Sequence, residues 1–277
     1  MSNSPEQTWP VALVTGAGGG MGQVIAARLA DRYALALSEF REEPLAQLVN
    51  MLAAQGVNPA ATATGDLGSP QVLEPLMASC KGRLKAVVHT AGHSPQTGTW
   101  RQILDINLVT TAKLLDAIEA QMEPGLAVVL IASMGRLVSP PAEGALGEVL
   151  ENPLAPDFLD RMEPFLGEEE QKPYTAYALS KLWVAREVSR RSIGWGPRGA
   201  RIMSISPGMI YTRMGTSAVV EAGADVLLEQ TPLRRWGTPM DIANVAEFIL
   251  SDKGSFLTGS DILVDGGTGQ IIQALKG

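Results

Sequence analysis

Short apolar runs alternate with amphipathic stretches along most of this 277-residue chain. The apolar runs are nearly continuous, which is typical of strands buried on both faces, and they predict strands at Val11–Thr15, Tyr33–Ser38, Ala60–Thr64, Leu84–Thr90, Leu126–Ala132, Arg201–Ser206 and Ile262–Val264. Apolar positions at helical spacing predict helices at 21–32, 44–55, 70–80, 101–122, 175–193 and 239–250. Because strands that alternate with helices form parallel sheets, we expect one doubly wound α/β domain over residues 1–277, with seven mostly parallel strands and helices on both faces.

Residues 139–172 interrupt this pattern. The segment holds five prolines, nine acidic and two basic residues, so it accounts for the whole formal net charge of −7. It is too rich in proline for a sheet strand and too long for an ordinary connection. We expect either two or three short helices packed as a flap, or a solvated and partly disordered insertion.

The bulk composition narrows the class of protein. Outside the acidic segment the charges balance and no cluster of Lys and Arg is present, which excludes a nucleic-acid surface. No apolar run reaches the roughly 18 residues that a membrane span needs, and the polar start of the chain does not resemble an export signal. One cysteine, Cys80, suits a reducing cytoplasm, and with only His89 and His93 beside it we expect no metal site.

A glycine-rich loop joins the first predicted strand to the first predicted helix. The sequence Thr15-Gly-Ala-Gly-Gly-Gly-Met-Gly22 allows a tight turn and a close approach of backbone amides to a pyrophosphate. The pattern GxxxxGK[ST] is missing, so a mononucleotide P-loop does not explain the glycines. Just beyond the second strand, the Glu39 carboxylate can bind an adenosine ribose and would repel a 2′-phosphate. With only Arg41 nearby to favour that phosphate, the sequence favours NAD(H) over NADP(H).

Tyr177 and Lys181 are four residues apart and therefore share one face of a predicted helix. The ammonium is expected to favour the phenolate, so that the tyrosine can exchange a proton near neutral pH.

The motifs occur in an order that resembles the short-chain dehydrogenase/reductase family. They are TGxxxGxG, Asp66-Leu67, Thr90-Ala91-Gly92, Asn107, Ser133, YxxxK, Pro207-Gly-Met-Ile-Tyr-Thr212, and a tail with Pro232-Leu-Arg-Arg235, Gly237-Thr-Pro239, Thr258-Gly259 and Val264-Asp-Gly-Gly267. The resemblance runs from about residue 9 to 268, with residues 139–172 standing outside it, and implies a Rossmann-type domain.

The resemblance also implies roles for individual residues. The expected catalytic residues are Tyr177 as general acid/base, Lys181 holding the nicotinamide ribose, Ser133 bonding the substrate oxygen, and Asn107 holding a water next to Lys181. The expected cofactor residues, besides Glu39, Tyr177 and Lys181, are Gly16, Gly20, Met21 and Gly22 on the phosphates, Asp66 and Leu67 at the adenine, and Ala91, Gly92, Pro207, Gly208, Ile210 and Thr212 toward the nicotinamide. His89 is expected to be a strand residue and not a catalyst.

Two departures from the family pattern stand out. Thr90 replaces the usual asparagine of Asn-Ala-Gly, and its hydroxyl is expected to replace part of the missing bonding. Tyr177 follows Ser133 by 44 positions, and this stretch includes the acidic insertion, as in the members that resemble 3α-hydroxysteroid dehydrogenase/carbonyl reductase. The family's substrate lid is expected at about Arg213 to Gln230, and this range contains apolar residues. Apart from Arg136 and Arg213, few positively charged residues are expected near the substrate.

These features favour a neutral, mostly apolar secondary alcohol or ketone as the small-molecule substrate. A 3-oxoacyl-thioester reductase and a non-catalytic dinucleotide-binding regulator are the alternatives. The resemblance further implies a homodimer or homotetramer formed through the helices at 101–122 and 175–193.

Overall fold

The computed structural model describes residues 9–216, 228–229 and 231–274. These residues form a parallel sheet of seven strands in the order β3-β2-β1-β4-β5-β6-β7. The strands are β1 (Val11–Thr15), β2 (Ala34–Glu39), β3 (Ala61–Thr64), β4 (Leu84–His89), β5 (Ala127–Ile131), β6 (Arg201–Pro207) and β7 (Asp261–Val264). The chain builds outward from β1 to β3 and then returns to the other side of β1, so β1 and β4 border the point where ligands bind in open α/β sheets. The doubly wound Rossmann-type fold is confirmed.

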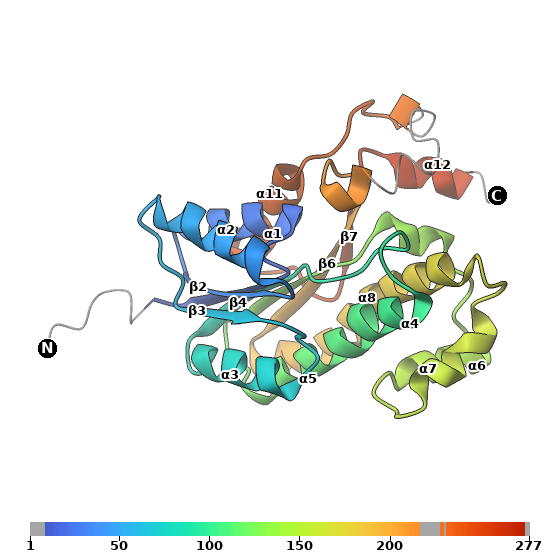
Figure 1. Ribbon diagram of the computed structural model, residues 1–277, viewed down its shortest axis with the longest axis horizontal. Coiled ribbons are helices and arrows are strands. Elements are labelled where there is room, and N and C mark those ends of the chain that lie inside the picture. The colour runs from blue at the N-terminus through green and yellow to red at the C-terminus, as the bar shows by residue number, and fades with distance from the viewer. Residues whose placement is uncertain (1–8, 217–227, 230, 275–277) are drawn as a thin grey trace, which may run out of the picture.

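Helices cover both faces of the sheet (Figure 1). One layer consists of α1 (Gly20–Leu29), α2 (Glu42–Ala53) and α11 (Pro239–Leu250). The opposite layer consists of α3 (Pro70–Cys80), α4 (Trp100–Leu104), α5 (Thr111–Ala120) and α8 (Lys172–Trp195). Successive side chains of β5 point to opposite faces of the sheet, and both faces are apolar, so each needs a layer of helices. Val128 and Leu130 point into the core beneath α5 and α8, whereas Val129 and Ile131 point to the other core.

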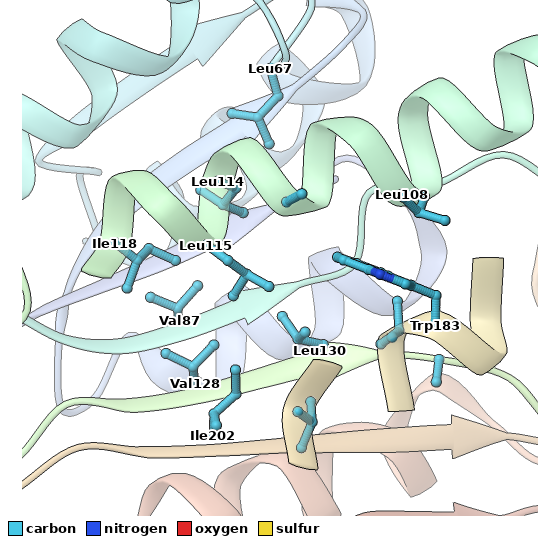
Figure 2. Packing of buried hydrophobic residues seen from close by; sticks show 14 of the residues in the cluster. Leu67, Val87, Leu108, Leu114, Leu115, Ile118, Val128, Leu130, Trp183 and Ile202 are labelled. Atoms are coloured by element: carbon cyan, nitrogen blue, oxygen red, sulfur yellow. The ribbon is translucent and has the colours of Figure 1, made fainter. Parts of the chain in front are cut away.

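The core beneath α5 and α8 is built mainly from aliphatic side chains, together with Trp100, Trp183 and Trp195. Figure 2 shows Val87, Val128 and Ile202 from three adjacent strands, with Val87 nearest to α5, while Trp183 reaches in from α8. The cluster supports α8, which carries the expected catalytic residues Tyr177 and Lys181. These two side chains are therefore mounted on a close-packed core.

The long helix expected at 101–122 is interrupted. Residues Asp105–Thr110 form a π-helical turn, η2, between α4 and α5, and Asn107 lies within this turn. Such turns are rare and are frequently found at functional sites.

The acidic segment 139–172 is folded, in agreement with the expectation of short helices and not with that of disorder. It forms α6 (Gly144–Glu151), α7 (Phe158–Met162) and the 3₁₀ turn η4 (Glu163–Phe165). Leu146, Leu150 and Phe158 are buried in the same cluster as α8. Figure 1 shows α6 and α7 beside the end of α4 and α8.

The remaining elements lie at both edges of the sheet, two of them after strands and two before strands. The 3₁₀ turn η3 (Met134–Val138) follows β5, η5 (Gly196–Arg198) follows α8, η6 (Asp252–Gly254) follows α11, and α12 (Thr268–Ala274) packs against η3. Among the helices that the structure describes, none is long and apolar enough to cross a membrane.

Candidate active site

The glycine loop leaves the N-terminus of α1 open to an anion. Gly16 has φ +65°, and a Cβ at this position would lie 2.7 Å from the Ala91 nitrogen, so only glycine fits. A Cβ at Gly20 would lie 2.9 Å from Cγ2 of Thr212, which brings the loop after β6 against the start of α1. The helix has neither a side-chain cap nor an acidic residue in its first turn. Its free N–H groups and its dipole therefore fit the pyrophosphate of a dinucleotide.

Glu39 lies at the end of β2 beside this loop. Its carboxylate accepts the Gly18 N–H at 3.0 Å and the Phe40 N–H at 2.8 Å. Arg41, the other residue weighed for cofactor choice, is exposed at the start of α2. The carboxylate is thus fixed beside the glycine loop with oxygens that can accept from ribose hydroxyls, whereas the guanidinium is exposed.

The two residues expected at the adenine, Asp66 and Leu67, differ in which of their atoms can contact the ring. Asp66 follows β3, and its carboxylate accepts the Gly68 N–H at 2.8 Å. The Leu67 side chain is buried in the same hydrophobic cluster and lies across α5 from the strand residues in Figure 2. Only the backbone of Leu67 is therefore available to an adenine ring.

The segment after β6 forms a second wall of the site. The Gly208 N–H donates to Val264 O at 2.9 Å, and Ile210 is buried and bridges to Gly237. The Thr212 hydroxyl accepts the Gly215 N–H at 3.0 Å. These contacts fix Pro207, Gly208, Ile210 and Thr212 next to the glycine loop. The expected lid at 213–230 falls mainly on 217–227 and 230, outside the described residues.

Ser133 and Tyr177 meet at the carboxyl edge of β5. The Ser133 hydroxyl accepts the Gly135 N–H at 3.0 Å. A Cβ at Gly135 would lie 3.2 Å from Cε1 of Tyr177 and 3.3 Å from Oγ of Ser133, so a side chain there would press on both residues. Gly135 is part of the site that sequence reasoning missed.

Lys181 lies one turn after Tyr177 on α8. Its ammonium donates to Ile131 O at 2.9 Å and lies 5.7 Å from the centre of the Tyr177 ring. Burial lowers the pKa of Lys181 to about 8. Burial also raises the pKa of Tyr177, and a hydrogen bond with Ser133 offsets part of that shift. Desolvation of the phenol therefore sets the direction of the Tyr177 pKa in this structure, and a lowering by Lys181 stays a prediction.

Asn107 is anchored through its side chain. The amide oxygen accepts the His93 N–H at 2.7 Å, and the amide nitrogen donates to His93 O at 3.0 Å and to the Ser180 hydroxyl at 3.2 Å. The Ser180 hydroxyl in turn donates to Tyr177 O at 2.8 Å. Both N–H hydrogens of the amide are therefore used to join the β4–α4 loop to α8. Ser180 adjoins Lys181, but its type alone gave no signal of this contact.

Thr90 stands where the family usually has asparagine, and its hydroxyl makes hydrogen bonds of the kind expected there. Its hydroxyl donates to Thr15 O at 2.8 Å, with Gly16 O at 3.1 Å, and so ties β4 to the glycine loop. Ala91 and Gly92 follow directly. A Cβ at Gly92 would lie 3.0 Å from Oδ1 of Asn107, so this turn has no room for a side chain.

Comparison with known proteins agrees with this geometry. Residues 10–145 match the sequence model described as short chain dehydrogenase, and residues 164–269 match the one described as Enoyl-(Acyl carrier protein) reductase. The chain is 30% identical to "Short-chain dehydrogenase/reductase bsc3" of Alternaria brassicicola, over 90% of this chain and 92% of that protein. The chain belongs to the short-chain dehydrogenase/reductase family. It is accordingly an oxidoreductase of a family that uses NAD(P) and acts on small molecules.

Other relatives of this short-chain dehydrogenase/reductase carry more specific names. D-threitol dehydrogenase of Mycolicibacterium smegmatis is 28% identical, over 93% of this chain and 92% of that protein. A 3-alpha-hydroxysteroid dehydrogenase/carbonyl reductase of Comamonas testosteroni is 27% identical, over 74% and 80%. The crystal structure of a short-chain type dehydrogenase/reductase from Mycobacterium ulcerans is 27% identical and superposes with a TM-score of 0.74, over 94% and 90%.

Arg136 lies in η3, three residues after Ser133, but its charge is already used in this short-chain dehydrogenase/reductase. The guanidinium contacts Asp261 at 2.8 and 3.0 Å and donates to the Ser206 hydroxyl at 3.0 Å. Asp261 also accepts from the Ser204 hydroxyl at 2.6 Å. The expectation of Arg136 as a charge available to substrate is therefore wrong.

Proposed function

We propose that this enzyme transfers hydride between NAD(H) and a neutral, mostly apolar secondary alcohol or ketone that is alicyclic, steroid-like or terpenoid. The observation that carries the proposal is the convergence of Ser133, Tyr177 and Lys181 beside an open glycine loop. A nicotinamide bound there supplies the hydride chemistry. Tyr177 gives a proton to the carbonyl oxygen or takes one from the alcohol, and the Ser133 hydroxyl bonds the same oxygen.

The two buried groups set the direction of the pH dependence. Because burial raises the pKa of Tyr177, the phenol holds its proton at neutral pH and is ready to donate it during ketone reduction. Alcohol oxidation needs the phenolate, which the Lys181 ammonium favours. We therefore expect oxidation to become faster as pH rises above neutral and reduction to become slower.

Glu39 supports the choice of NAD(H). Its carboxylate is fixed by two backbone N–H groups, so it cannot turn away from a 2′-phosphate without breaking them. Repulsion between this carboxylate and the 2′-phosphate weakens the binding of NADP(H), whereas the ribose hydroxyls of NAD(H) can donate to the carboxylate oxygens.

The apolar substrate class rests on the surroundings of Ser133 and Tyr177. Arg136 is occupied by Asp261, and the acidic side chains of the insertion are exposed apart from the half-buried Glu163. We propose that residues 139–172 form a flap beside the site and help to select the substrate. The relative named for hydroxysteroids agrees with this class, and the relative named for threitol makes polyols the first competing substrates.

A 3-oxoacyl-thioester reductase is the second candidate, because residues 164–269 match a family described for acyl carrier protein substrates. The acidic insertion argues against it, since carrier proteins are acidic and like charges repel.

The test is a panel of alicyclic, steroid, polyol and acyl-thioester substrates with both nicotinamide cofactors, followed by absorbance. Turnover of apolar secondary alcohols with NAD⁺, lost at least a thousandfold in Tyr177→Phe, supports the proposal. Thioester turnover with NADPH would favour the second candidate. Cofactor binding without turnover of any substrate would indicate a regulator. Light scattering separates the proposed homodimer from the homotetramer.

A further inference from the structure

His89 is buried at the end of β4 and contacts polar groups from two other elements. Its Nδ1 lies 2.6 Å from the hydroxyl of Thr15, the last residue of β1. Its Nε2 lies 2.8 Å from the hydroxyl of Thr111, the first residue of α5. The exposed fractions are 3% for His89, 0% for Thr15 and 1% for Thr111, so these contacts are closed to solvent. The roles given above to the catalytic residues make no use of His89.

The hydrogen-bond partners determine which ring nitrogen carries the proton. The Thr111 hydroxyl donates to Asn107 O at 2.9 Å, which uses its only hydrogen, so it must accept from Nε2–H. Nδ1 is then the acceptor of the Thr15 hydroxyl hydrogen. Every donor and acceptor is satisfied by one neutral tautomer, and all the hydrogen bonds run in one direction, from Thr15 to the Asn107 carbonyl.

The end of this chain is a carbonyl inside the π-helical turn. The backbone N–H of Thr111 is directed to Leu108 O, so the Thr111 hydroxyl takes its place on Asn107 O. The Asn107 side chain is held separately by His93 and Ser180. Removing the hydroxyl contact would leave the side chain anchored and the backbone of the turn free to change.

We propose that His89 is a positioning residue, which holds the Asn107 carbonyl through Thr111 and ties it through Thr15 to the strand that begins the glycine loop. The proposal rests on the proposed function, because it concerns the geometry beside Lys181 during proton transfer. Burial, with a smaller contribution from the positive charge of Lys181, lowers the pKa of His89 to about 3. The ring therefore stays neutral and acts by its fixed donor and acceptor, and not by titrating.

The kinetic test uses Thr111→Val, which keeps the shape of the side chain and removes the hydroxyl. We expect kcat to fall about tenfold, the value of one lost hydrogen bond, with both KM values within about twofold. The midpoint of the pH profile of kcat is expected to shift by about half a unit, because the turn that places Asn107 beside Gly92 and Lys181 loses one of its backbone contacts. Thr111→Ser restores the hydroxyl and should recover wild-type behaviour. Thr110→Val, a neighbouring buried threonine outside this chain of bonds, is the matched control.

A double-mutant cycle joins the effect to His89. The loss in His89→Asn,Thr111→Val should equal the larger single loss and not the product of the two. An unchanged pH profile in Thr111→Val, no recovery in Thr111→Ser, or independent losses in the cycle would each overturn the proposal. If His89→Asn does not fold, the kinetics of Thr111→Val, Thr111→Ser and Thr110→Val still test the proposal.

An NMR experiment does not depend on turnover. The chain has only two histidines, and half-buried His93 provides the titrating reference. In ¹⁵N-labelled protein, the His89 imidazole should carry its proton on Nε2 and show no titration between pH 5.5 and 8.5, and this signal should change in Thr111→Val. A protonated Nδ1 or a normal titration overturns the proposal even in active protein. If the NMR signals are as expected but the protein turns over no substrate, the proposed function is contradicted and the role of His89 is not.

Discussion

Replacing Glu39 by alanine is expected to move the cofactor preference from NAD⁺ toward NADP⁺. The carboxylate lies at the end of β2, where its two oxygens accept the N–H groups of Gly18 and Phe40 at 3.0 and 2.8 Å. Each oxygen keeps a further lone pair for a ribose hydroxyl. The substitution therefore removes an acceptor for NAD⁺ and a fixed negative charge that faces a 2′-phosphate.

The size of the effect follows from these two contributions. A hydrogen bond to a charged group contributes about 1.5–3 kcal/mol, and because Glu39 is half-exposed we take the lower value, which weakens NAD⁺ binding about tenfold. The repulsion between two like charges near a surface is about 4 kcal/mol at 4 Å and is reduced by salt, so its removal should strengthen NADP⁺ binding about tenfold or more. Together they change the ratio of the two specificity constants about a hundredfold.

The assay measures kcat/KM for NAD⁺ and NADP⁺ at one fixed alcohol concentration. Glu39→Gln keeps the length of the side chain and should give an intermediate ratio, because it removes the charge and retains one acceptor. Glu42→Gln, an exposed acid three residues on, is the matched control for a general change of surface charge. A ratio in Glu39→Ala within threefold of the wild type would refute the assigned role of this carboxylate.

Three further predictions concern the frame around the site. Arg136→Met removes the ion pair with Asp261, so η3 should loosen and kcat should fall about three- to tenfold, measured beside a thermal melt. Glu187→Gln breaks a buried pair with Arg191 and should lower the unfolding free energy at pH 7 by about 3 kcal/mol. Burial raises the pKa of Glu187, but hydrogen bonds from Arg190 and Arg191 outweigh it and hold that pKa below its usual range. The difference in stability should therefore narrow as urea melts are repeated below about pH 4. Thr238→Ala removes the capping box of α11 and should lower stability by about 1 kcal/mol in urea, with kcat unchanged.

The parts of the fold that depend on local pattern could be predicted from the sequence. Apolar runs such as Leu126–Ala132 indicate a strand buried on both faces, and β5 occupies that range. Tyr177 and Lys181 share a helix face because four residues make about one turn, and both lie on α8. Periodicity does not depend on the rest of the chain, so these elements follow from short stretches of sequence.

What could not be predicted depends on contacts between distant residues. The π-helical turn at Asn107 is anchored by His93, 14 residues away, and by Ser180, 73 residues away. Arg136 finds Asp261 across 125 residues, so its charge is absorbed by a partner that no local pattern reveals. The pKa of Tyr177 was expected to fall because a lysine is near in sequence, but the direction is set by burial, which is known only once α8 is packed.

The insertion is joined to the site by its apolar side chains and not by its charges. An exposed ion pair such as Arg101 with Asp160 contributes at most about 1 kcal/mol, and a segment held only in this way could move without affecting the active site. Leu150 and Phe158, however, are buried in the core that α8 shares, and the Trp183 indole donates to Leu150 O at 3.0 Å. Trp183 lies two residues after Lys181. Changing the exposed acids should therefore alter the surface charge and leave the chemistry intact, whereas shortening Leu150 or Phe158 should disturb the helix that holds the catalytic residues.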